Sequence, residues 1–145
     1  MDTDSETSIT LTRTIDVPAE ELFAAWTDPA LLEQWQAEKV SFEPFEGGAF
    51  RFETVDADDP EAVHVVSGTV LVYEPESKLV ERWHYQGENE DIEQSVLTVV
   101  FKDIGEGRTE ITLTEEAEAH KDAESRIFSI EAWDAAIGEL AELLE

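Results

Sequence analysis

The hydrophobic period of this sequence changes near residue 121, and this change constrains the fold more than any other feature. From there onward apolar residues recur at steps of three and four, which is the spacing of one helical face. They are Ala123, Ile127, Ile130, Trp133, Ile137, Leu140 and Leu144. About 24 residues at 1.5 Å each give a helix of roughly 36 Å, long enough to cross a whole sheet. The sequence therefore predicts a long C-terminal helix with an inward apolar stripe that another layer must cover.

The segment from Lys39 to Glu116 has the period-two pattern of a sheet. Leu97, Val99 and Phe101 share one face of a strand because side chains alternate along it. Clusters of turn-forming residues separate such runs. These clusters lie at 46–48, 56–61, 74–77, 86–91 and 103–107. We expect six consecutive strands here, forming an antiparallel meander.

Before this segment, residues 9–15 alternate apolar and polar side chains and predict one more strand. Pro18 and the Asp28-Pro29 pair each suit the start of a helix. We therefore expect two short helices after the first strand. We find no linker, internal repeat or low-complexity tract, so residues 1–145 are expected to form a single domain, with 1–7 as a disordered tail.

The N-terminal residues carry acidic side chains and no apolar run, so we expect neither a signal peptide nor a membrane anchor. No stretch approaches the roughly 20 apolar residues of a membrane span. Cysteine is absent, which excludes disulfides and thiolate chemistry and agrees with a reducing compartment. We expect a cytoplasmic protein.

The charge is strongly acidic, with 36 acidic and 9 basic residues and a net charge of −27. Nucleic acid and anionic membranes are therefore disfavoured as partners. Self-repulsion of this size is largely screened at molar salt, where the Debye length is about 3 Å. We expect a halophilic protein from a salt-accumulating cytoplasm; an ordinary acidic cytosolic protein is the alternative.

Several short motifs follow one another in an order typical of a known family. They are VPAEELF at 17–23, WTDP at 26–29, Trp35, Gly47-Gly48, Gly68, EP at 74–75, KLVERW at 78–83, AW at 132–133 and Leu140. In number, order and spacing they resemble the START-like (SRPBCC) superfamily, and within it the branch named for the activator of heat-shock protein 90 ATPase (AHSA). The resemblance covers nearly the whole chain, from about residue 8 to residue 145.

This resemblance implies an α+β, helix-grip fold, in which a curved antiparallel sheet wraps around the long C-terminal helix and leaves a cavity between them. Related proteins bind lipids or other hydrophobic ligands, act as cyclases or aromatases, or assist a chaperone. The fold therefore does not fix the function. We expect an apolar ligand cavity with a few polar groups; a filled core is the alternative. The expected ligand-binding residues are Trp35, Phe50, Phe52, Glu81, Trp83, Tyr85, Leu97, Val99, Phe101, Phe128, Trp133 and Ile137.

Glu81 is the polar candidate of most interest. It alternates in phase with Leu79 and Trp83, so it is expected to face the concave side of the sheet. A carboxylate there could anchor a ligand, with a donor such as Tyr85 nearby, or could act as an acid or base. The alternative is a wetted position at the cavity mouth.

Other chemistry finds little support in the sequence. His64, His84 and His120 lack metal-ligand spacing, and no Gly-x-Ser-x-Gly elbow is present. We therefore expect no metal, no cofactor and no catalytic residue. Arg51 and Arg82 are expected to pair with carboxylates across the sheet, although Arg51 could instead meet an anionic headgroup.

The function expected from these features is binding of a small hydrophobic molecule. One alternative is a chaperone-cofactor module that presents a surface to a chaperone. A further alternative is an enzyme of the cyclase or aromatase type, for which no catalytic signature is present; an enzyme is the less favoured class.

Overall fold

A computed structural model describes residues 8–35, 38–55, 63–86, 92–117 and 123–144. Ten helices and strands lie in these ranges. In chain order they are β1 (Ser8–Ile15), α1 (Ala19–Thr27), α2 (Pro29–Trp35), β2 (Lys39–Phe42), β3 (Ala49–Val55), β4 (Val63–Glu74), β5 (Lys78–Gln86), β6 (Ile92–Gly105), β7 (Arg108–Ala117) and α3 (Ala123–Leu144). The predicted order of one strand, two short helices, six strands and a long helix is confirmed.

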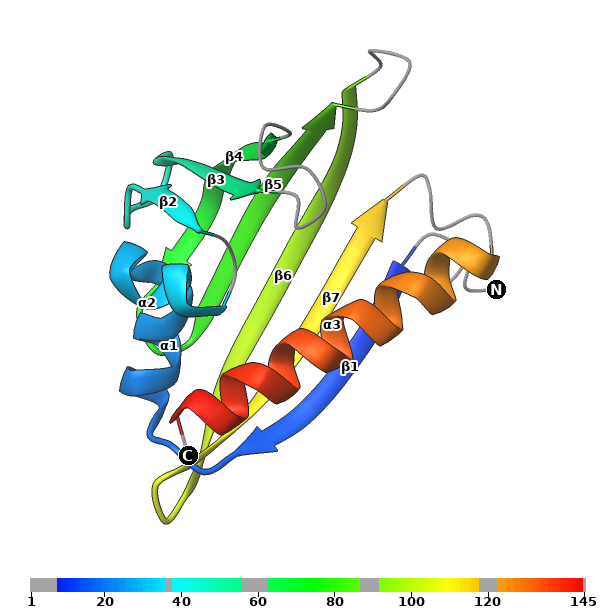
Figure 1. The fold of residues 1–145 in the computed structure, drawn as a ribbon. Coiled ribbons are helices and arrows are strands. Elements are labelled where there is room, and N and C mark those ends of the chain that lie inside the picture. Colours follow the sequence, from blue (N-terminus) through cyan, green and yellow to red (C-terminus); the bar gives the residue numbers. More distant parts are fainter. Residues whose placement is uncertain (1–7, 36–37, 56–62, 87–91, 118–122, 145) are drawn as a thin grey trace.

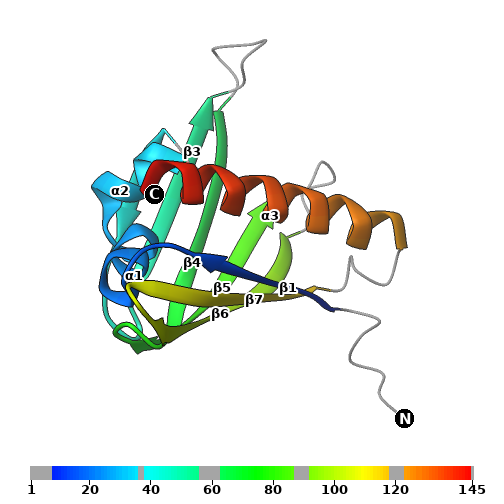
Figure 2. The same cartoon turned by 90° about the horizontal axis from the view of Figure 1, so that it is seen from below.

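The seven strands form one antiparallel sheet in the order β1-β7-β6-β5-β4-β3-β2. The strands from β2 to β7 pair with their sequence neighbours, as a meander requires. β1 extends the sheet by pairing with β7. The two edge strands are therefore β1 and β2. Figures 1 and 2 show the curved sheet with the three helices on one of its sides. This arrangement is the predicted helix-grip fold.

Gly68 in β4 allows an aromatic ring to lie directly on the sheet. Phe50 is its cross-strand neighbour. A Cβ atom at residue 68 would lie 2.3 Å from Cζ of Phe50 and 2.1 Å from the carbonyl oxygen of Arg82. Only a residue without a side chain fits such a close approach.

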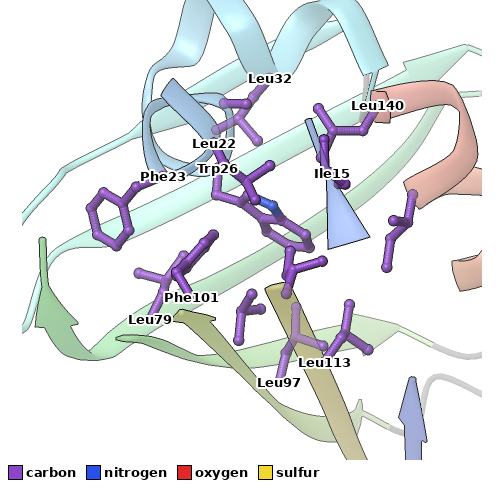
Figure 3. Packing of buried hydrophobic residues seen from close by; sticks show 14 of the residues in the cluster. Ile15, Leu22, Phe23, Trp26, Leu32, Leu79, Leu97, Phe101, Leu113 and Leu140 are labelled. Carbon is purple, nitrogen blue, oxygen red and sulfur yellow. The ribbon is translucent and has the colours of Figure 1, made fainter. Parts of the chain in front are cut away.

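The core lies between the inner face of the sheet and the helices. Figure 3 shows Trp26 of α1 among Leu22, Leu32, Leu97 and Leu113, which come from α1, α2, β6 and β7. All five of these side chains are buried. The two short helices therefore close one end of the sheet, next to the last turns of α3 (Figure 1).

The helix α3 is packed unevenly along its length. Ile137, Leu140 and Ala141 are buried, whereas Ile127 is 57% exposed and Ile130 is 38% exposed. The prediction that one continuous stripe faces inward is therefore wrong for the first half of the helix. The periodicity identifies a helical face, but the buried residues of that face lie in the second half of the helix.

None of the described helices combines the length and hydropathy needed to cross a bilayer.

Candidate functional site

The sheet register brings two carboxylates to the centre of the inner face. Glu81 of β5 lies opposite Leu97 of β6, and Leu97 lies opposite Glu115 of β7. The same row continues to Val70 on one side and to Ile9 on the other. Directly opposite residues share a face of a sheet, so both carboxylates point toward the helices. With strands about 4.8 Å apart, their backbones are separated by roughly 10 Å.

Glu81 is buried, with 2% of its surface exposed. Its Oε1 accepts a hydrogen bond of 3.1 Å from Nε1 of Trp83. Burial raises the pKa of Glu81 from its ordinary value near 4.5 to about 8, and the indole N–H offsets part of this shift. The predicted inward orientation is confirmed, and the alternative of a wetted position at the cavity mouth is wrong.

Glu115 repeats this arrangement two strands away. It is 7% exposed, and its Oε2 accepts a hydrogen bond of 3.1 Å from Nε1 of Trp133 on α3. Glu115 was not among the predicted site residues. Its signal was available, because it continues the alternation of Ile111 and Leu113 along the inner face.

The four tryptophans of the chain lie in contact with one another. The rings of Trp133 and Trp26 stack with centroids 6.1 Å apart and an interplanar angle of 23°. Trp83 meets Trp133 edge to face at 6.5 Å, and Trp35 meets Trp26 in the same way at 4.8 Å. Indoles from α1, α2, β5 and α3 therefore form one continuous aromatic group, which we call the tryptophan cluster.

Phenylalanine rings extend the tryptophan cluster across the sheet. Phe50 and Phe52 of β3 each meet Trp83 edge to face, at 5.3 and 5.1 Å. Both phenylalanines are buried. The predicted set of Trp35, Phe50, Phe52, Trp83 and Trp133 is thus brought together in space.

The remaining predicted residues divide into three groups. Leu97, Val99 and Ile137 are buried in the common core, and Phe101 packs against Phe23 of α1 at 5.2 Å. The side chain of Tyr85 lies outside the described part of the chain. Phe128 is 74% exposed. Its predicted place among the lining residues is contradicted, because it lies on the outer side of the half of α3 that packs least.

The outer face of the sheet carries a separate depression of about 460 Å³. Its walls include Ser41, Arg51, Ser67 and His84, which lie opposite one another on neighbouring strands. Arg51 forms an ion pair of 2.7 Å with Glu53, two residues along the same strand. The pairing predicted for Arg51 therefore runs along β3 and not across the sheet.

The described ranges contain no group of three or more histidine or acidic side chains that could hold a metal ion. His84 lines the outer depression, away from the two buried carboxylates. His120 and the side chain of His64 lie outside the described residues. Among the described residues, the centre of the inner face offers the carboxyl groups of Glu81 and Glu115 and the aromatic rings beside them.

Comparison with known families gives a match over residues 16–145 to the family described as activator of Hsp90 ATPase homolog 1-like protein. The match covers most of the chain. The protein belongs to this family. The resemblance seen in the sequence motifs is thereby confirmed. No curated protein matches this chain.

Solved structures share the fold. A protein from Rhodobacter sphaeroides has 24% identity and a TM-score of 0.82, with coverage of 99% of this chain and 95% of that chain. An HSP90 activator from Plasmodium falciparum has 26% identity and a TM-score of 0.60, with coverage of 76% and 72%. DynU16, from the dynemicin biosynthetic locus, has 20% identity and a TM-score of 0.77, with coverage of 95% and 47%. The first and third likenesses concern the fold alone.

Proposed function

We propose that this protein binds a small hydrophobic molecule between the inner face of the sheet and α3. One observation carries the proposal: two nearly buried carboxyl groups lie within an otherwise aromatic and aliphatic surface. Binding sites for small molecules combine apolar walls with a few placed polar groups. A core that served packing alone would gain nothing from Glu81, because burying a carboxyl group costs free energy.

The packing of α3 supports the same proposal. This helix contacts β1 and α2 most closely, while Trp133 reaches from it to Glu115 and to the ring of Trp83. Two large aromatic side chains therefore lie between α3 and the central strands, together with aliphatic ones. A ligand that displaces Trp133 would meet the Trp83 ring and both carboxyl groups at once.

The test uses the tryptophan cluster as its own reporter. A neutral aromatic hydrocarbon, neopentylbenzene, is titrated into the protein while tryptophan emission is recorded. Saturable binding is expected, and Trp133→Leu is expected to weaken it, because this change removes both the ring and the indole donor. The matched control is Phe128→Ser on the exposed side of α3, which is expected to leave the affinity unchanged. Equal affinity in wild type and Trp133→Leu would contradict the proposal.

A second candidate function, a chaperone-cofactor surface, is favoured by the exposed apolar residues of α3. Ile127, Phe128 and Ile130 lie on its first half. Exposed apolar patches of this kind often mark partner surfaces. One structural relative is an HSP90 activator. Stimulation of HSP90 ATPase activity by the wild-type protein, and its loss in Phe128→Ser, would favour this function over ligand binding.

The net charge supports a proposal about the salt concentration and the compartment in which the protein works, whichever function it has. A net charge of −27 on 145 residues favours a protein that works at high salt in the cytoplasm, as a single folded domain.

A further inference from the structure

The inner face presents carboxyl groups and aromatic rings together. Glu81 and Glu115 are the carboxyl side chains in the central row, and each accepts a hydrogen bond from an indole N–H. The N–H of an indole lies in the plane of its ring, so the hydrogen bonds to Glu81 and Glu115 do not themselves occupy a ring face. Trp83 and Trp133 are in edge-to-face contact at 89°, so two perpendicular ring planes lie beside the carboxyl groups.

The tryptophan cluster also holds a polar atom that its neighbours do not satisfy. Nε1 of Trp26 is buried and has no hydrogen-bond partner within the described residues. The side chain of Trp26 is only 1% exposed, and its ring stacks on Trp133. A buried donor without an acceptor is costly in a core that serves packing alone. The cluster therefore has the character of a binding surface as well as that of a core.

Aromatic faces and carboxylates share one preferred ligand chemistry. The face of an indole is the negative part of its quadrupole and attracts cations within about 6 Å of the ring centre. A buried carboxylate is stabilised when a positive charge is placed beside it. The burial that raises the pKa of Glu81 marks a position where a positive partner would be favourable.

We propose that the ligand bound under α3 is an organic cation, such as an aromatic or aliphatic ammonium compound. It lies in the corner between Trp83 and Trp133, with Glu81 and Glu115 as its counter-ions. This inference rests on the proposed function, because it names the chemical class of the molecule that binds at the same site. Binding of this cation makes and breaks no covalent bond.

The test uses three probes that share one ring and differ in charge. They are benzyltrimethylammonium, its neutral carbon isostere neopentylbenzene, and the anion benzenesulfonate. Affinities are measured through tryptophan emission at pH 9, where most of Glu81 is ionised. The cation is expected to bind about tenfold or more tightly than the neutral isostere, and the anion more weakly than both.

A protein with a charge of −27 attracts any cation, so the surface contribution must be separated from the site. The measurements are therefore repeated in 1 M potassium chloride, where surface attraction is screened. Glu81→Gln is compared with Glu131→Gln, an equal charge change at an exposed position of α3. Glu81→Gln is expected to reduce the preference for the cation to less than about threefold, whereas Glu131→Gln is expected to retain it. Glu115→Gln is expected to act like Glu81→Gln.

The outcomes separate the two proposals. Saturable binding of neopentylbenzene with no preference for the cation would overturn the inference and leave the proposed function standing. Binding of none of the probes would refute both. A preference that disappears in 1 M salt, or that is the same in Glu81→Gln and Glu131→Gln, would assign it to the surface charge and overturn the inference.

Discussion

Replacing Glu81 by glutamine should make the protein more stable at alkaline pH. The side chain keeps its shape and an oxygen that accepts the N–H of Trp83, but it loses the ionisable group. In the unfolded chain the carboxyl group ionises near pH 4.5, whereas in the folded protein burial raises its pKa to about 8. Between these values the folded state holds a proton that the unfolded state has released.

The magnitude follows from linkage. Each pKa unit corresponds to about 1.4 kcal/mol, so from pH 5 to pH 9 the wild-type carboxyl group removes on the order of 4 kcal/mol from the free energy of unfolding. The sign is fixed by the direction of the shift. Because the pKa of Glu81 is raised in the folded protein, its carboxyl group contributes fully to the free energy of unfolding below about pH 4.5. This contribution is lost as the pH rises through 8.

The assay is urea unfolding of wild type, Glu81→Gln and the exposed control Glu131→Gln at several pH values from 5 to 9, in high salt. The difference between wild type and Glu81→Gln should grow by roughly 4 kcal/mol over this range, and that between wild type and Glu131→Gln should stay nearly constant. A constant difference for Glu81→Gln would show that this carboxyl group titrates alike in both states, which would refute the reasoning from its burial.

Two further predictions concern stability. Gly68→Ala should destabilise the protein by about 2 kcal/mol or more, because the Cβ of the alanine would overlap the Phe50 ring and a backbone oxygen. Gly138→Ala on α3 should instead stabilise the protein by about 0.5–1 kcal/mol, because alanine favours the helix and its Cβ would meet Arg13 at 3.5 Å. Urea unfolding of both variants checks this contrast, and similar effects would contradict it. The melting temperature should rise between 0.1 M and about 3 M potassium chloride, because the charge of −27 becomes screened. A flat series, or an equal rise in a variant with reversed surface charges, would remove the case for halophily.

The sequence predicted the sheet well because alternation is a local property of each strand. The same alternation predicted that Glu81 faces inward, and extended along β7 it would also have predicted Glu115. The indole partners of these carboxyl groups could not be predicted. Trp133 and Glu115 are 18 residues apart, and their contact depends on how α3 lies on the sheet.

The misassignment of Phe128 has a related cause. A helical stripe shows which residues share a face, but not how far along the helix that face stays packed. Ile137 and Leu140 belong to the same buried cluster as side chains of α1 and α2, whereas Ile127 is exposed. The difference between the two halves of α3 is therefore a property of the assembled fold.

The uneven packing of α3 also bears on how its amide protons exchange with water. Amides in residues 123–130 are held by helical hydrogen bonds with little buried surface behind them, so they should exchange through local fraying. Amides around Ile137 and Leu140 should exchange only when the core opens. Exchange should therefore be faster in the first half of α3 than in the second, so the N-terminal half of this helix should open without unfolding of the sheet.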